Sequence, residues 1–324
     1  MERTKLKGGS LSGTYHCIDK SRSFIRKEVS LTENREFGFY RWFSQLKKLQ
    51  RFGRMFPKLV PKVIGIGLEG GMSYFDLEFI GNGMTVQEFL VKNPSPKDVE
   101  RVLKELLRVM DVLHSVKMPS FRGGFELYID QEVKHALSFC MDDPTFRAFA
   151  KHKTIVFNGK ETPSLIYRIE EFQNLAAKHY VKPEECLTHG NITLENLLYV
   201  PEENRIVFID LYEENYIDTV WNDYSQIAQS CNSLYELYNK KTPVIKGNSV
   251  TASIEYSPGL DAFNKLFKKF LGEKLTPDEL VVTNLYEVSQ FTRMLPFKKT
   301  IAKDKMILFY ALASQLFDQI SQTD

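Results

Sequence analysis

The chain has 324 residues, of which 43% are hydrophobic and 26% charged, and its formal net charge is +2. This composition is typical of a globular protein whose core is large enough for one big domain or two lobes. The near-neutral charge and the absence of blocks of like charge argue against nucleic-acid binding. No apolar stretch could cross a bilayer, and the first residues lack the apolar core of a signal peptide. We therefore expect a soluble cytoplasmic protein with no membrane insertion; its oligomeric state stays open.

The first eighty residues predict several strands around one helix. Residues 14–18 and 23–29 carry the β-branched and aromatic content of two paired strands. Apolar residues at helical spacing predict a helix over 35–52. Residues 62–66 and 73–79 predict two further strands, separated by a turn rich in glycine.

The rest of the chain predicts mostly helices. Ser95 and Pro96 form a good helix start ahead of a long apolar stripe. Asn158-Gly159 predicts a short hairpin. Residues 165–179 predict a helix, and beyond Asp218 the pattern is helical to the end.

This order of elements predicts an α+β fold with two lobes. A regular alternation of strands and helices is missing, which argues against a doubly wound parallel sheet. We expect a small β-rich N-lobe over residues 1–80, which binds a nucleotide. A larger helical C-lobe over residues 81–324 is expected to hold the catalytic and metal-binding loop.

The segment from Thr188 to Asp210 carries the strongest functional signal. His189 and Gly190 open a loop, Asn196 follows in it, and Asp210 ends an apolar run beyond a short turn. An Asn and an Asp on the two sides of a β-hairpin are suitable ligands for Mg²⁺ held against nucleotide phosphates. We therefore predict Asn196 and Asp210 as metal ligands, and His189 as a brace for the loop backbone.

A lysine inside an apolar strand indicates a possible phosphate ligand. Lys27 shares one face of its strand with Ile25 and Val29, and burying an unpaired ammonium is costly. Glu36, early in the next helix, could hold it as kinases hold the lysine that grips the α- and β-phosphates. Glu33 is a second candidate for this role. The other interpretation is an edge strand with Lys27 in water.

Two further segments could contact the nucleotide through their backbones. A Gly/Ser turn near the N-terminus would let N–H groups approach phosphate oxygens, although it could also be only a turn. The strand that leads into a predicted hinge at residues 81–83 could serve an adenine edge, although it could also be only a core strand. The candidate nucleotide contacts in these segments are Gly8, Gly9, Ser10, Glu78 and Ile80.

Together these residues resemble the signature of a known group of enzymes. The string HGNxxxxN at residues 189–196, followed by FID ending at Asp210, is similar to the HGDxxxxN…D signature of the aminoglycoside phosphotransferase and choline kinase group. These are small-molecule kinases with a protein-kinase-like fold, and the chain looks most similar to their capsule-biosynthesis-associated members. The resemblance covers about residues 7–230, including Asp223, where the family has an Asp that supports the catalytic loop. It implies a two-lobed fold with ATP and Mg²⁺ in the cleft.

The chain departs from that signature at Asn191. In the family an Asp at this position accepts the proton of the substrate hydroxyl or orients that hydroxyl, whereas Asn can hydrogen-bond an alcohol but cannot take its proton. General-base help is typically worth ~10²–10⁴ in rate, while positioning and Mg²⁺ supply much of phosphoryl transfer. The change therefore predicts a slow enzyme. It is also compatible with a natural pseudokinase, with a deliberate Asp-to-Asn variant, or with a base elsewhere, at Glu195, Glu213 or Glu214.

The resemblance implies an ATP-dependent phosphotransferase that moves the γ-phosphoryl group to a hydroxyl of a sugar or amino alcohol, in surface-polysaccharide metabolism. Asn191, His189 and Asp210 are its expected catalytic residues, and the expected partner is a small-molecule hydroxyl acceptor. The alternative is a pseudokinase, a nucleotide-binding regulatory or scaffolding module. A third hypothesis is a helical interaction protein without a nucleotide site.

Overall fold

A computed structural model of the chain describes its residues except 1, 7–12, 21, 34–35, 120–123, 183, 213–214 and 324, and describes residues 36 and 37 by their backbone only. The described residues form two compact units. The first comprises Met1–Phe89, Lys104–Val109 and His189–Asn215; the second comprises Leu90–Leu103, Met110–Thr188 and Tyr216–Asp324. We expected a division at residue 80. The contacts instead group the loop that contains His189, Asn196 and Asp210 with the N-terminal segment that contains Lys27.

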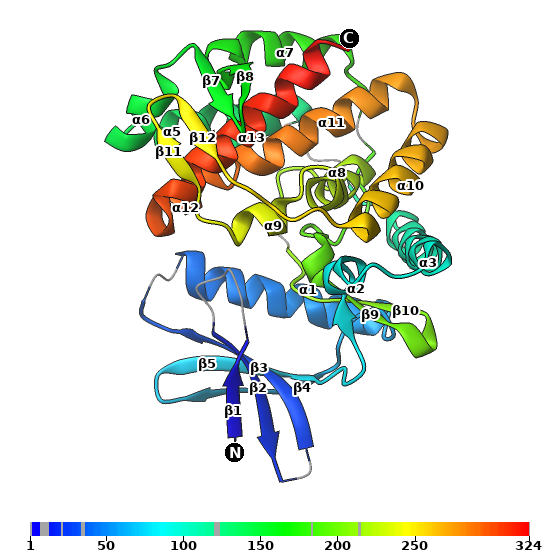
Figure 1. Cartoon of the computed structure of the whole chain (residues 1–324). Coiled ribbons are helices and arrows are strands. Elements are labelled where there is room, and N and C mark those ends of the chain that lie inside the picture. Colours follow the sequence, from blue (N-terminus) through cyan, green and yellow to red (C-terminus); the bar gives the residue numbers. More distant parts are fainter. Residues whose placement is uncertain are drawn as a thin grey trace. The chain divides into compact units, whose positions relative to one another are not determined.

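Five antiparallel strands form the main sheet of the first unit (Figure 1). They are β1 (Glu2–Lys5), β2 (Gly13–Asp19), β3 (Arg22–Ser30), β4 (Val63–Glu69) and β5 (Met72–Glu78), in the order β1-β2-β3-β5-β4. Strands β2 to β5 confirm the four predicted strands, and β1 adds one that was not predicted. The register sets Lys27 opposite Phe75. Because side chains alternate along a strand, Lys27, Val29 and Phe75 share one face of the sheet.

Helix α1 (Arg41–Met55) packs on the face of this sheet that carries Lys27 (Figure 1). A π-helix over Glu36–Tyr40 precedes it, so the predicted helix begins with a different winding and ends three residues later than expected. The Trp42 ring lies 5.3 Å from that of Phe75, and its Nε1 donates to the Lys27 carbonyl at 3.3 Å. Trp42 begins the buried apolar stripe that joins the helix to the sheet.

A second antiparallel sheet in the first unit carries the predicted functional loop. Its order is β10-β9-β6, with β6 at Met84–Thr85, β9 at Leu197–Val200 and β10 at Arg205–Phe208. The loop from His189 leads into β9, and Asp210 follows β10, so both lie at the same end of the β9–β10 hairpin. The Ile209 N–H donates to the Asn196 carbonyl at 3.0 Å, which joins the two sides. The predicted hairpin between Asn196 and Asp210 is therefore confirmed.

Helices dominate the second unit. Two helices, α2 (Val86–Val91) and α3 (Pro96–His114), have residues in both units, and the Ser95 hydroxyl caps α3 by accepting from the Asp98 N–H, as predicted. Helices α11 and α13 are buried along most of their length and form the centre of this unit's core. The helices of the second unit are α4 (Gly124–Ile129), α5 (Ala136–Cys140), α6 (Pro144–Ala150), α7 (Ile169–Lys178), α8 (Val220–Cys231), α9 (Tyr235–Asn239), α10 (Pro258–Lys274), α11 (Pro277–Thr292), α12 (Leu295–Ile301) and α13 (Lys303–Ser321).

A small sheet in the second unit corrects one expectation and confirms another. Strands β7 (Thr154–Phe157) and β8 (Lys160–Pro163) form the hairpin predicted at Asn158-Gly159. The expectation of helices throughout the chain beyond Asp218 is wrong, because β11 (Val244–Lys246) and β12 (Ser249–Thr251) form a second hairpin there. Gly247 turns it at φ +59°, and β12 is stabilised by parallel pairing with the distant β7. Among the described helices, none combines the length and apolarity needed to span a membrane.

Candidate active site

Lys27 is the centre of a buried polar cluster in the first unit. Only 5% of the residue is exposed, and its ammonium donates to Gln45 Oε1 at 2.9 Å and to Asp210 Oδ1. Lys27 and Asp210 are far apart in the sequence, so this ion pair depends on the tertiary fold. An ammonium has three N–H donors. With Gln45 and Asp210 as the acceptors among the described residues, one donor is left to face a ligand.

The carboxylate of Asp210 is ionised and partly accessible. Asp210 has the left-handed conformation, φ +55°, which Asp tolerates better than most residues. Its side chain is 38% exposed. Desolvation alone would raise the pKa of its carboxyl, but the charge of the Lys27 ammonium, its hydrogen bond and the charge of Arg41 outweigh that effect and lower the pKa. Asp210 therefore presents a negative charge near neutral pH, and Oδ2 accepts no hydrogen bond from the described residues.

Helix α1 supplies the polar partners of this cluster through Gln45 and Lys48, which the sequence analysis did not single out. Gln45 Nε2 donates to the carbonyl of Leu211 at 3.3 Å, and the buried Lys48 ammonium donates to the carbonyl of Tyr212. The side chain of Glu36, the expected partner of Lys27, lies outside the described part of the chain. Glu33, the other candidate, is exposed, and no contact joins it to Lys27.

A signal for Gln45 and Lys48 was present in the sequence. Both lie between Trp42 and Phe52, within a helix stripe that is otherwise apolar. A long polar side chain in such a stripe needs a buried partner, and here the partners are two successive carbonyls that follow Asp210.

The loop at His189 is tied to the segment after Asp210. His189 is fully buried, its Nδ1 accepts from the Asn191 N–H at 3.2 Å, and its ring meets Phe208 edge-on at 5.2 Å. The Tyr212 N–H donates to the His189 carbonyl at 3.1 Å. The imidazole thus orients the backbone at Asn191, which is how we expected it to act.

Gly190 allows the closest approach between these two segments. Its φ is +82°, and Asn215 Nδ2 donates to its carbonyl at 3.3 Å. A Cβ at this position would overlap the Tyr212 carbonyl oxygen and lie 2.7 Å from Asn215 Nδ2 and 3.2 Å from Lys48 Nζ. Gly190 is therefore required both by its conformation and by the lack of space.

Asn196 is held with its carboxamide oxygen available. Its Nδ2 donates to the Asn191 carbonyl at 2.8 Å, and among the described residues no donor reaches its Oδ1. Asn191 is half-buried, next to this contact. Glu195 is also half-buried, whereas Glu213 and Glu214 lie outside the described residues.

The oxygens of Asp210 and Asn196 fit a metal that arrives with its own ligands. Within the described residues, no three His, Cys, Asp or Glu side chains form a cluster that could hold a metal ion by themselves. Mg²⁺ is usually held by one or two carboxylates together with substrate phosphates and waters. One charged and one neutral oxygen donor match that donor set.

The remaining predicted residues contribute less to this cluster. Gly8, Gly9 and Ser10 lie outside the described residues. The Glu78 N–H donates to the Lys62 carbonyl at 2.9 Å, and the Ile80 carbonyl accepts from the Gly83 N–H at 3.1 Å. These backbone groups are therefore already used within the chain.

Asp223, which the family resemblance marks, lies in the second unit. It is fully buried in α8, and its Oδ2 lies 3.1 Å from Nε2 of His114 on α3.

Comparison with known structures identifies the fold. The chain is similar to a point mutant of aminoglycoside 2'-phosphotransferase-IIIa solved in complex with GDP, with a TM-score of 0.62, 12% sequence identity, and coverage of 99% of this chain and 93% of the other. A second match is Rad53 in complex with AMP-PNP, with a TM-score of 0.34 and 10% identity over 98% of this chain and 65% of that one. No protein-family model matches the sequence, and no curated protein matches it. The first of these matches confirms the α+β, kinase-like fold, and its 12% identity shows the fold alone.

Proposed function

We propose that this protein is a Mg²⁺- and ATP-dependent phosphotransferase whose acceptor is a hydroxyl of a small molecule. The observation that carries the proposal is the buried Lys27, whose ammonium donates to Asp210 and Gln45 and has a third donor that no described residue accepts. An unpaired N–H on a buried ammonium suits a phosphate oxygen. The kinase-like fold supports this assignment, because phosphoryl transfer depends mainly on positioning and charge.

Each residue of the cluster has a distinct role in this proposal. Lys27 binds a phosphate oxygen, and Asp210 and Asn196 hold Mg²⁺, which when bound neutralises charge on the phosphates. His189 fixes the backbone of Asn191, which hydrogen-bonds the acceptor hydroxyl and orients it. Gln45 and Lys48 keep the segment after Asp210 in place. The acceptor class, a sugar or amino alcohol of surface-polysaccharide metabolism in the cytoplasm, is supported by the sequence resemblance.

Asn191 supports a second candidate, a nucleotide-binding module with little catalysis. A carboxamide can hydrogen-bond the acceptor but cannot take its proton. Asn191→Asp discriminates between the two, because it supplies a base at the position where the related signature has one. We expect ATP-dependent transfer to a panel of sugars and amino alcohols to rise by ~10²–10⁴ in this variant. An unchanged rate would favour the binding module.

Calorimetric titration with ATP, with and without Mg²⁺, tests the shared premise. We expect metal-dependent binding that weakens by at least about tenfold in Lys27→Met and in Asn196→Ala. Lys20→Met, an exposed lysine on the β2–β3 turn, is the matched control and should bind like the wild type. Absence of binding at millimolar ATP, or equal effects of Lys27→Met and Lys20→Met, would refute the proposal.

A further inference from the structure

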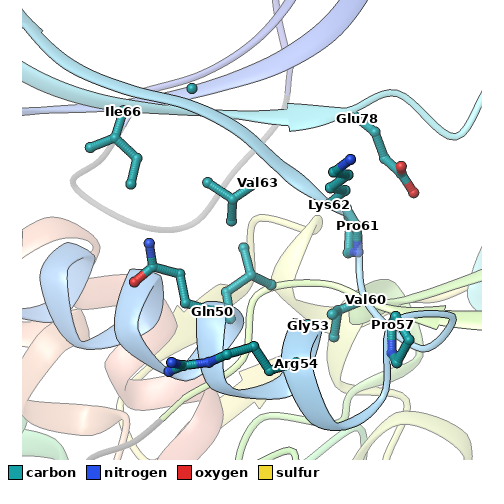
Figure 2. Close-up of a pocket in the computed structure, with 12 residues that line it drawn as sticks. Gln50, Gly53, Arg54, Pro57, Val60, Pro61, Lys62, Val63, Ile66 and Glu78 are labelled. Carbon is teal, nitrogen blue, oxygen red and sulfur yellow. The ribbon is translucent and has the colours of Figure 1, made fainter.

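A pocket lies between helix α1 and strand β4, lined by residues that are almost all outside the candidate active site. Its volume is about 830 Å³, within the range of binding sites. In Figure 2, Gln50 and Arg54 come from the helix, and Val63 and Ile66 face them from β4. Val60, which is buried, adds an apolar surface to the lining. The pocket thus has apolar walls and polar groups around them.

Strand β4 offers a free backbone edge beside this pocket. In the sheet order of the described residues, β4 is terminal and has a strand neighbour only in β5. Two of its apolar side chains are exposed, Ile66 by 52% and Leu68 by 70%. An edge strand of this kind is a template for another extended chain unless charge or a cover prevents pairing. β4 has no charged residue before Glu69.

The segment that forms the pocket carries an excess of positive charge, which the overall charge of the chain conceals. Residues 37–68 contain no Asp or Glu. They contain seven cationic residues: Arg41, Lys47, Lys48, Arg51, Arg54, Lys58 and Lys62. Two of these, buried Lys48 and Arg41, belong to the candidate active site. Arg54 and Lys62 line the pocket, are exposed, and form no ion pair with the described residues. Glu78 is the only carboxylate of the lining.

We propose that the groove formed by α1 and β4 is a docking site for an extended acidic segment of a partner protein. The partner's backbone pairs with the free edge of β4, one or two of its apolar side chains enter the pocket, and its carboxylates face Arg54 and Lys62. Side chains two or four residues apart along a strand point to the same face, so an apolar side chain and a carboxylate at such positions can reach the pocket and its two cations together.

The charge distribution selects this occupant over a second copy of the chain. A symmetric contact of two β4 edges would bring the same cationic surface against itself, and like charges placed opposite each other are destabilising. An acidic segment removes that repulsion and adds attraction that screens with salt.

A peptide-display selection against the full chain tests the proposal. We expect the selected decapeptides to be acidic, with an apolar residue and a carboxylate two or four positions apart. Their affinity should fall by at least about tenfold in Arg54→Glu combined with Lys62→Glu. Lys5→Glu combined with Lys20→Glu reverses two exposed cations elsewhere on the same unit and is the matched control. Gly53→Leu, which places a side chain in the pocket without changing charge, should also weaken binding.

Hydrogen exchange distinguishes strand pairing from a purely electrostatic contact, because only strand pairing would protect the backbone amides of β4. Bound peptide should slow amide exchange within Val63–Glu69 and leave β1, at the opposite end of the sheet order, unchanged. The proposal is wrong if no peptide is selected, if selected peptides are neutral or basic, if both double variants bind alike, or if β4 exchange is unaffected. Binding of anionic phosphatidylglycerol vesicles that depends on Arg54 and Lys62, without peptide binding, would assign the surface to a membrane instead.

Discussion

Gly190→Ala is the sharpest perturbation of the candidate active site. Two penalties act at this position. The first is conformational, because φ is +82° and an L-residue in the left-handed region is less stable by about 1–2 kcal/mol. The second is steric, because the new Cβ would overlap the Tyr212 carbonyl oxygen and lie 2.7 Å from Asn215 Nδ2. The backbone after Asp210 must then move, and its hydrogen bonds to His189 and Gly190 stretch.

The structure contains a control that separates these two penalties. Gly71 has φ +78°, close to that of Gly190, but a Cβ there would have no neighbour within 4 Å. Gly71→Ala therefore carries only the conformational penalty. Gly190→Ala adds an overpacking penalty of about 1–3 kcal/mol and the weakening of two hydrogen bonds at about 0.5–1.5 kcal/mol each. We expect the two variants to differ by about 2–6 kcal/mol.

Urea unfolding followed by circular dichroism gives the two free energies of unfolding. Gly190→Ala should also lose Mg²⁺-dependent ATP binding under conditions where it remains folded, whereas Gly71→Ala should retain it. A difference below about 1 kcal/mol between the variants would contradict the packing argument. Intact ATP binding in Gly190→Ala would show that the contact between the two loops does not position the site.

Three further changes test other parts of the structure. Asp143 accepts a hydrogen bond from Lys303 at 2.6 Å, which lowers the pKa of its carboxyl below the ordinary 3.8. Asp143→Asn should therefore reduce the free energy of unfolding by about 1 kcal/mol near pH 7. Urea unfolding at several pH values should show this difference between variant and wild type vanishing as the pH falls below about 4. Gly53→Ala should raise thermal stability by about 0.5–1 kcal/mol, since its Cβ would meet one neighbour at 3.9 Å within a helix. Gln45→Leu should lower the free energy of unfolding by about 1–3 kcal/mol and weaken ATP binding in calorimetry, because a buried carbonyl and the Lys27 ammonium each lose a partner.

The elements that the sequence predicted well are those with a strong local pattern. Strands β2 to β5 have β-branched and aromatic runs bounded by turns. The hairpin around Asn158-Gly159 has the residue pair that two-residue hairpin turns prefer. Strands β11 and β12 were missed because three residues carry too little pattern to compete with a helical interpretation. Their stability comes from pairing with β7, which is distant in sequence.

The same distinction applies to the candidate site. A lysine in an apolar strand indicated that Lys27 needs a partner, but no local pattern could show that Asp210 and Gln45 provide it. Gln45 was overlooked because it carries no charge. The net charge of the whole chain likewise gave no sign of the cationic segment 37–68, because acidic residues elsewhere in the sequence balance its charge.

The pairing of Lys27 with Asp210 predicts how metal and nucleotide depend on each other. Among the described residues, Asp210 is the carboxylate that contacts Lys27, and Gln45 adds no charge. If Asp210 holds Mg²⁺ as proposed, the metal would weaken the attraction of that carboxylate for Lys27, and phosphate at Lys27 would weaken the attraction of Lys27 for Asp210, so each ligand would favour binding of the other. Asp210→Asn should therefore abolish the effect of Mg²⁺ on ATP affinity while raising metal-free ATP affinity by about fivefold, the ~1 kcal/mol expected of a partly exposed charge pair. Titrations of both proteins in EDTA measure the second effect. Weaker metal-free binding by the variant would mean that Asp210 orients Lys27 toward the phosphates and does not compete with them.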